Sequence, residues 1–309
     1  MSAPGRILVI KLSALGDFVQ MMGAAASVRA FHRGARITLL TTAPYAELAR
    51  QAPYFDEVWV DERPGWGDPL GILRLRRRLR DGQFDRVYDF QTRLRSSFYF
   101  RLMRDRGRPE WSGIAAGASH PHANPRRDEM HTLDRQDEQL RMAGIPGPSP
   151  LPDLSWATAD IGCFALPPDY VLLIPGGAAH RPDKRWPIGH YGALALRLAA
   201  AGLAPVVVGG ADERALGRSI TAAEPATRDL TGQTGFGDIV ALGGGARRAI
   251  GNDTGPMHLA VAGGAAATVL YSAASDPALT APRGRDVAIL QRPDLAALPV
   301  EAVAATLEW

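Results

Sequence analysis

Two short polar segments, each containing a lysine, hold residue types and spacings that could do chemistry. The chain has 35 lysines and arginines, and only Lys11 and Lys184 are lysines. Because lysine offers a compact ammonium rather than a broad guanidinium fork, a retained lysine suggests a site that needs a point charge. Lys11 opens the sequence KLSALGD, in which Asp17 falls in the first turn of a predicted helix. A carboxylate there either caps the helix or takes a proton from a substrate hydroxyl.

The second lysine follows a pair of glycines that come directly after a predicted strand. Gly176 and Gly177 would let the backbone approach a phosphate closely, and Lys184 would add a positive charge. The spacing matches neither the Walker phosphate loop nor the dinucleotide-binding fingerprint. An ordinary structural turn therefore stays open as the alternative.

The most specific polar segment is 251–258, with the sequence GNDTGPMH. Its proline suits the first turn of a helix. The amides of Thr254 and Gly255 would then point out of a helix N-terminus, which is a ready site for an anion. Asp253 would hold the loop or contact a sugar hydroxyl. His258 could donate to a phosphate, with a buried structural histidine as the alternative.

The elements that must position these segments alternate between strands and helices in both halves of the chain. Short apolar runs predict strands, and longer stretches with helical spacing predict helices between them. Such alternation indicates parallel sheets with crossover helices. In the first half the predicted strands are 6–11, 36–41, 57–60 and 86–89. In the second half they are 170–174, 205–208, 248–250 and 267–271.

A stretch rich in proline and glycine, 144–152, separates the two halves and suits a linker. At 309 residues the chain also exceeds what one core usually holds. The sequence therefore predicts two doubly wound domains, 1–155 and 156–309. Ligands are expected at the carboxyl ends of strands that face the cleft between the domains. The last predicted helix, 300–308, could pack back on the first domain.

Composition describes an ordinary globular chain, with 46% hydrophobic and 22% charged residues. No segment has the about 20 strongly apolar residues that a membrane-spanning helix needs, and no signal-like segment opens the chain. We therefore expect a cytoplasmic protein. The lone Cys163 excludes an internal disulfide and a cysteine-based metal site. Because the histidines also lack the spacing of zinc ligands, no metal site is expected.

Charge is unevenly distributed along the chain. Residues 1–150 carry a net +6 and residues 151–309 a net −3, and the segment 74–108 holds twelve arginines against four aspartates. This segment is either a solvated helix face or a surface for an anionic partner. No interleaved aromatic residues and no nucleic-acid-binding module accompany the arginines. A nucleic acid is therefore not the expected partner.

Five segments in this order resemble the ADP-heptose:lipopolysaccharide heptosyltransferases, glycosyltransferase family nine. The likeness spans nearly the whole chain. It begins with the first strand and Lys11, Ser13, Gly16 and Asp17. The other segments that carry it are 84–96, 134–144, 184–187 and 253–258.

The resemblance implies a GT-B fold, in which two Rossmann-like domains face a central cleft. It implies an inverting, metal-independent transfer of a heptose or related sugar from an ADP-sugar to a lipopolysaccharide core or other envelope glycan. No cofactor is implied, the ADP-sugar being a co-substrate. Asp17 would be the general base, and Lys184 would steady the departing diphosphate. The residues that would bind the donor are Ser13, Gly16, Gly176, Gly177, Lys184, Glu213, Asp253, Thr254, Gly255 and His258.

An arginine-rich first half suits a phosphorylated or acidic glycolipid acceptor at the inner face of the inner membrane. The chain would then be cytoplasmic with peripheral membrane contact. The candidate acceptor contacts are Arg76, Arg77, Arg93 and Arg95.

Two places depart from the family's pattern. Gly23 stands where a proline is usual, and the segment 272–275 replaces the Gly-Pro-Thr that often follows the last strand. Because that segment lies near the expected nucleotide site, the identity of the donor stays open. The alternatives are a nucleotide-sugar epimerase or hydrolase on the same fold, and a nucleotide-sugar-binding protein without turnover.

Overall fold

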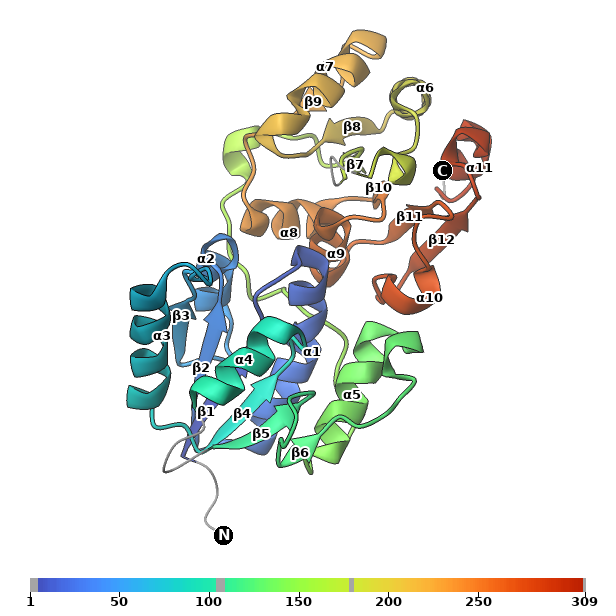
Figure 1. Cartoon of the computed structure of the whole chain (residues 1–309). Helices are drawn as coiled ribbons and strands as arrows, with labels where there is room; N and C mark the ends of the chain where they lie inside the picture. The colour runs from blue at the N-terminus through green and yellow to red at the C-terminus, as the bar shows by residue number, and fades with distance from the viewer. Residues whose placement is uncertain (1–4, 104–108, 178–180, 308–309) are drawn as a thin grey trace. The chain divides into compact units, whose positions relative to one another are not determined.

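The structure is a computed structural model that describes residues 5–103, 109–177 and 181–307. The chain divides into two compact units, Met1–Pro150 and Leu151–Trp309, drawn from blue to red along the chain in Figure 1. The division falls inside the proline- and glycine-rich stretch, whereas the sequence placed it after residue 155.

The first unit contains a six-stranded parallel sheet in the order β3-β2-β1-β4-β5-β6. Its strands are β1 (Arg6–Ile10), β2 (Arg36–Thr41), β3 (Glu57–Val60), β4 (Arg86–Asp89), β5 (Glu110–Gly113) and β6 (His120–Pro121). Its α-helices are α1 (Leu15–Phe31), α2 (Ala43–Gln51), α3 (Pro69–Asp81), α4 (Leu94–Leu102) and α5 (Thr132–Met142).

The second unit repeats this plan with a six-stranded parallel sheet in the order β12-β11-β10-β7-β8-β9. Its strands are β7 (Tyr170–Ile174), β8 (Ala204–Val207), β9 (Arg228–Asp229), β10 (Arg248–Asn252), β11 (Ala267–Tyr271) and β12 (Val287–Gln291). Its α-helices are α6 (Ile188–Ala200), α7 (Arg214–Ala223), α8 (Phe236–Gly245), α9 (Gly255–Ala262), α10 (Pro277–Thr280) and α11 (Val300–Ala304).

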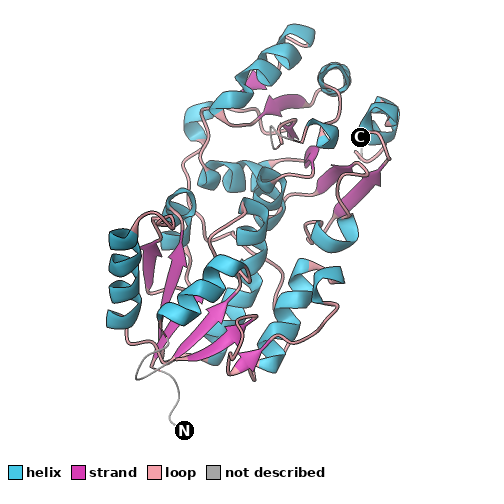
Figure 2. Ribbon diagram, viewed as in Figure 1, coloured by secondary structure: helices cyan, strands magenta, loops and turns pink. Residues whose placement is uncertain are grey.

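Central strands are buried on both faces, which explains their unbroken apolar sequences. In β1, Ile7 to Ile10 have no exposed side chain, and β7 and β11 are buried throughout. Figure 2 shows the strands of each unit as magenta arrows accompanied by cyan helices. The predicted α/β class with two doubly wound parallel sheets is confirmed.

Edge elements are where the structure differs from the sequence prediction. The strands β5, β6, β9 and β12 were not predicted. The first three are two to four residues long and contain polar residues, and β12 has the apolar run 287–290 but is only partly buried at the edge of its sheet. The final helix α11 packs against α6, and Val300, Val303 and Ala304 belong to the core of the second unit. Among the described residues, no helix combines the length and apolar character needed to span a membrane.

Helices α8 and α9 pack so closely that a glycine is required between them. A Cβ at Gly243 would lie 2.7 Å from the Cα and 2.8 Å from the carbonyl oxygen of Ala260. Close-packed interiors do not absorb an extra methyl group without displacement of neighbouring atoms.

We expect Gly243→Ala to destabilise the second unit by about 1–3 kcal/mol through overpacking. Urea denaturation followed by tryptophan fluorescence measures this change. Gly189→Ala in helix α6 is the matched control, because a Cβ there meets no atom within 4 Å. The control should be neutral or more stable by up to about 1 kcal/mol. Equal stability of both variants would contradict the proposed packing constraint.

Candidate active site

A buried lysine and a half-exposed aspartate meet where β1 ends in the first unit. Lys11 is buried, and its Nζ donates to the carbonyl oxygen of Phe90 at 3.2 Å. The same Nζ lies 3.7 Å from Oδ2 of Asp17, whose side chain is 40% exposed. Burial lowers the pKa of Lys11, and the negative charge of Asp17 opposes that shift. The buried ammonium of Lys11 thus pairs with the carboxylate of Asp17, which remains accessible to solvent.

The loop that carries Asp17 is fixed by the amide side chain of Gln91, which follows the neighbouring strand β4. Its Oε1 accepts the backbone N–H groups of Leu12 at 2.8 Å and Ser13 at 3.0 Å. Its Nε2 donates to the Ser13 hydroxyl at 3.4 Å. Gly16 follows as the second residue of α1. The ends of two adjacent strands are therefore joined directly beneath Asp17.

Asp89, the last residue of β4, is fully buried below this loop. Its Oδ1 accepts the backbone N–H groups of Gln91 and Thr92, each at 3.0 Å. Burial raises the pKa of Asp89 to about 6, although these hydrogen bonds favour the charged form. We infer that Asp89 shapes the turn, because no part of its side chain reaches solvent.

A polar pocket opens beside Asp17, and positive charge dominates its lining. Three arginines contribute to it, Arg93 before α4, Arg127 before α5 and Arg135 within α5. Burial lowers the pKa of Arg127, and the positive charges of Arg135 and Arg93 lower it further. Such crowding of guanidinium groups suits an anionic ligand. The other lining residues are Lys11, Phe90, Gln91, Thr92, Asp128, Gln136 and Gln139.

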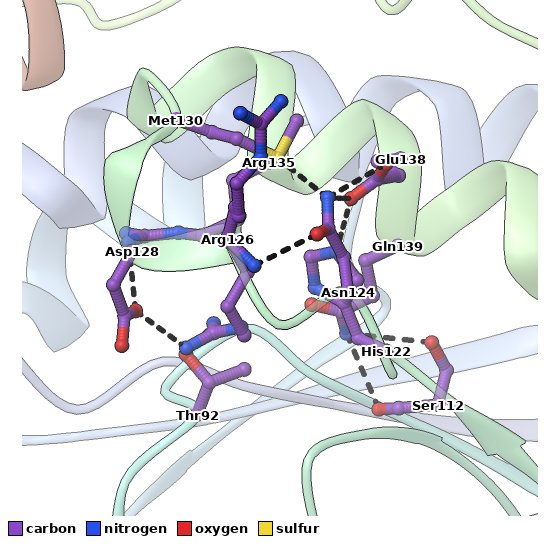
Figure 3. Close-up of polar contacts among 11 residues, drawn as sticks. Thr92, Ser112, His122, Asn124, Arg126, Asp128, Met130, Arg135, Glu138 and Gln139 are labelled. Atoms are coloured by element: carbon purple, nitrogen blue, oxygen red, sulfur yellow. Dashed lines mark hydrogen bonds and ion pairs between the residues drawn. The ribbon is translucent and has the colours of Figure 1, made fainter.

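Hydrogen bonds among the segment before α5 and α5 itself hold these arginines in place. Figure 3 shows Asn124 between the backbone of Arg126 and the carboxylate of Glu138, to which it donates at 2.9 and 3.1 Å. His122 contacts the same carboxylate at 2.7 Å. Arg127 then donates to the Thr92 hydroxyl at 3.1 Å. The loop is therefore tied both to α5 and to the end of β4.

Only one of the four arginines predicted to contact an acceptor lines this pocket. Arg93 does, whereas Arg95 donates to the Pro64 carbonyl at 3.3 Å and to the Tyr99 hydroxyl at 3.4 Å. Arg76 and Arg77 lie on α3 and line a separate hollow near Phe84. Sequence reasoning missed Arg127 and Arg135, because only the fold brings α5 beside β4.

The second unit also pairs its lysine with an aspartate. Nζ of Lys184 lies 2.6 Å from Oδ2 of Asp253, with side chains 16% and 9% exposed. Burial alone would raise the pKa of Asp253, but the hydrogen bond and charge of Lys184 outweigh it. Together with smaller contributions from Ser275 and His258, the hydrogen bond and charge of Lys184 hold the pKa of Asp253 below its ordinary value. The predicted anion-binding lysine therefore also neutralises the neighbouring carboxylate.

Asn252, the last residue of β10, organises the loops around this pair and was not predicted from the sequence. It is fully buried, and its Nδ2 donates to the carbonyl oxygens of Pro175 at 2.8 Å and Gly176 at 3.1 Å. Its Oδ1 accepts from the Trp186 backbone at 2.9 Å and from the Tyr191 hydroxyl at 3.2 Å. The only sequence signal was its place in GNDTGPMH, directly before Asp253.

Glu213 links the two glycine turns of the second unit. Its Oε1 accepts the Gly177 N–H and its Oε2 the Gly210 N–H, both at 2.9 Å. A Cβ on Gly176 or on Gly209 would lie 2.0 or 2.6 Å from this carboxylate. The glycines therefore make room for a carboxylate that fixes both turns. Its predicted contact with a nucleotide ribose would use the remaining lone pairs of these oxygens.

Helix α9 starts directly after Asp253. Thr254 is its N-cap residue, and Gly255 and Pro256 begin the helix. His258 is buried and contributes a favourable charge to Asp253. The segment 272–275, which differs from the family's usual sequence, lies close to Asp253. Ser275 helps to lower the pKa of Asp253, and Arg181 donates to the carbonyl oxygen of Ala274. The segments around 184 and 253 that the sequence singled out are thus brought together.

Within residues 5–103, 109–177 and 181–307, no three His, Cys, Asp or Glu side chains gather as a metal-binding group. His120 contacts the Ser119 hydroxyl, and His122 contacts the carboxylate of Glu138.

A sequence model of glycosyltransferase family 9 (heptosyltransferase) matches residues 72–302. The chain belongs to this family. It is therefore a glycosyltransferase, as the resemblance of its five segments indicated.

The chain is similar to named relatives in sequence and to solved structures in fold along nearly its whole length. Lipopolysaccharide heptosyltransferase 2 of Salmonella typhimurium is 27% identical over 308 residues, covering 93% of this chain and 88% of that protein. The structure of ADP-heptose lipopolysaccharide heptosyltransferase II of E. coli matches with a TM-score of 0.80 at 23% identity, covering 98% and 97% of the two chains. E. coli heptosyltransferase WaaC with ADP matches with a TM-score of 0.80 at 21% identity, covering 98% and 99%. The expected GT-B class is confirmed.

The Lys184–Asp253 pair gives a test of the second unit's electrostatics. A carboxyl whose pKa is lowered on folding stabilises the protein above its unfolded pKa, and this contribution is lost as the pH falls through the folded pKa. Removing the lysine leaves a buried, unpaired carboxylate at neutral pH. We expect Lys184→Met to cost about 3 kcal/mol at pH 7. The cost should be clearly smaller near pH 4, because burial raises the pKa of Asp253 once Lys184 is gone and the variant's carboxyl then takes up a proton.

Urea denaturation at the two pH values measures this difference. The double variant Lys184→Met/Asp253→Asn should recover most of the loss at pH 7, because no buried charge remains. Arg197→Met, which breaks an exposed ion pair with Glu301, is the control and should cost at most about 1 kcal/mol. A loss in Lys184→Met that does not depend on pH would show that the pair is not the cause.

Proposed function

We propose that this family 9 enzyme transfers a heptose or related sugar from an ADP-linked donor to a lipopolysaccharide core or another envelope glycan. The transfer inverts the anomeric centre and needs no metal ion. The observation that carries the proposal is the solvent-accessible carboxylate of Asp17, held 3.7 Å from the buried ammonium of Lys11 at the carboxyl end of β1. A fixed base next to a positively charged pocket suits a hydroxyl acceptor that bears acidic groups.

In the proposed reaction, Asp17 takes the proton of an acceptor hydroxyl. The oxygen of that hydroxyl forms a bond to the anomeric carbon of the donor sugar, and the bond from that carbon to the diphosphate oxygen breaks. The leaving group is ADP, and its charge grows as the bond breaks. Attack from the face opposite the diphosphate inverts the configuration.

Charge on the departing diphosphate would be stabilised by groups of the second unit. Lys184 has two further N–H donors besides the one on Asp253, and the N-terminus of α9 at Thr254 and Gly255 offers backbone amides. Preorganised donors of this kind can stabilise a leaving group without a metal ion. The ADP in the WaaC structure supports an adenine nucleotide donor. The remaining donor contacts predicted from the sequence stay predictions.

Acceptor binding is proposed for the pocket beside Asp17, with Arg93, Arg127 and Arg135 facing an acidic or phosphorylated glycan. These residues lie within reach of the proposed base, whereas Arg76, Arg77 and Arg95 do not line the pocket. A lipid-anchored acceptor of this kind would bring a cytoplasmic enzyme to the inner face of the inner membrane.

The direct test is Asp17→Asn. Without its base the variant should lose transfer by about 10²–10⁴-fold. Its affinity for ADP should change little, because Lys184, Thr254 and Gly255 lie in the second unit and the substitution leaves Ser13 and Gly16 in place. Product formation from ADP-heptose and calorimetric titration with ADP measure the two effects. Asp169→Asn is the matched control, since Asp169 pairs with Arg247 at the amino end of β7. A fully active Asp17→Asn enzyme would remove the proposed base, and tighter binding of UDP or GDP than of ADP would contradict the donor.

Lys11 gives a second test through the pH dependence of transfer. Because burial lowers its pKa below the ordinary lysine value, Lys11 loses its proton on the alkaline side earlier than a free lysine does. The charge that holds Asp17 then disappears, so the rate of the wild-type enzyme should fall as the pH rises through this range. Lys11→Met should be slower at neutral pH and should lack this alkaline decline.

Single-turnover rates between pH 6 and pH 10 measure the two profiles. A role limited to packing would lower activity in Lys11→Met without changing the shape of the profile, and that outcome would contradict the electrostatic role.

A further inference from the structure

Four large apolar side chains of the first unit are exposed around the starts of α3 and α4. Trp66, in the loop after β3, is 74% exposed, and Leu94, the first residue of α4, is 91% exposed. Leu70 and Leu73 on α3 are 66% and 56% exposed. We refer to these four residues as the apolar rim. Isolated exposed leucines are ordinary, but a group of this size on one edge is typical of an interaction surface.

Contacts within the first unit join Trp66 to α4 and the loop before α3 to α3 itself. The ring of Trp66 meets that of Phe98 on α4 edge-on, with centroids 4.8 Å apart. Leu94 lies one helical turn before Phe98 and therefore on the same face of α4. The loop itself rests on α3, because a Cβ at Gly71 would lie 2.8 Å from Cβ of Pro64.

Helix α3, which carries Leu70 and Leu73 of the rim, also carries positive charge. Its thirteen residues include five arginines and a single aspartate. The side chains of Arg74 and Arg77 are 67% and 84% exposed, and each pairs only at the surface, with Asp68 and Asp81 at 4.0 and 3.5 Å. Exposed ion pairs of this kind contribute little to stability. The arginines can therefore leave their aspartates and bind another anion.

Leu70 and Leu73 share their face of α3 with Arg74 and Arg77, which follow them at i+4 spacing. Exposed tryptophan and leucine with arginines beside them are residue types that anchor a protein in a membrane interface. The charge complementarity favours an anionic bilayer over a second copy of the chain. In a symmetric dimer through this surface, each copy would bring its own arginines against those of the other.

We propose that the apolar rim inserts into the interfacial layer of an anionic lipid bilayer, with the arginines of α3 on the lipid phosphates. The biological role of this docking rests on the proposed function, in which the acceptor is a glycolipid. The rim follows β3 and β4 at the carboxyl edge of the sheet, and Asp17 follows β1 at the same edge. Docking there would present the pocket beside Asp17 to an acceptor whose lipid part stays in the membrane.

The experiment is co-sedimentation of the full chain with vesicles that contain phosphatidylglycerol, compared with vesicles of phosphatidylcholine alone. The wild-type chain should bind the anionic vesicles, and added salt should weaken the binding. The variant Trp66→Ser/Leu70→Ser/Leu73→Ser should bind at least about tenfold more weakly, because it lacks three apolar side chains that would enter the bilayer. Its matched control is Phe31→Ser/Leu151→Ser/Leu196→Ser, three residues that are 48–49% exposed elsewhere. The control should bind like wild type, and thermal melting verifies that both variants fold.

Lack of vesicle binding by the wild-type chain, or equal binding by the two triple variants, would overturn the proposal. A rim variant that sediments as a monomer where the wild type dimerises would assign the rim to a second copy and would also overturn it. Transfer to a deacylated, water-soluble acceptor separates this proposal from the proposed function. That transfer should be unchanged in the rim variant, and its absence from the wild type would count against the function and not against docking.

Discussion

A side-chain amide that joins two adjacent strand ends is the interaction on which both sites depend. In the first unit Gln91 binds the backbone of the loop after β1, and in the second Asn252 binds the loop after β7 and the backbone of Trp186. An amide can donate and accept at once without carrying a charge. It therefore satisfies loop backbone in a place where an unpaired carboxylate or ammonium would be costly to bury.

Next to each amide the chain places one of its two lysines against an aspartate, but with opposite exposure. Lys11 is almost completely buried while Asp17 reaches solvent, so the aspartate is the group that a ligand can meet. In the second unit both partners are largely covered, and Lys184 keeps further donors for an anion. A lysine–aspartate pair thus occurs in both units. In the first unit its accessible member, Asp17, suits a base, and in the second unit Lys184 suits an anion-binding cation. These are the two charges that the proposed transfer uses.

The sequence predicted the central strands well, because burial on both faces leaves apolar runs such as those of β2, β7 and β11. It did not predict β5, β6, β9 and β12, whose pairing depends on neighbours rather than on their own residues. The loops with Asp17, Lys184 and Asp253 could be found, since glycine, proline and aspartate there follow strands directly. Gln91, Asn252 and Arg127 could not, because their importance comes from partners 66 to 79 residues away or from another helix. The acceptor contact of the α3 arginines was predicted from charge and stays a prediction, and in the structure Arg76 and Arg77 line a different hollow from the pocket beside Asp17.

The scarcity of lysine has a practical consequence for work with this enzyme. Both lysine side chains are at most 16% exposed, and both sit inside a proposed site. Reagents that acylate primary amines therefore find no lysine on the open surface, so dyes or cross-linkers of this type would leave most of the molecule untouched. Any lysine that did react would report that one of the two pairs had opened, which makes amine chemistry a probe of the sites rather than a general label.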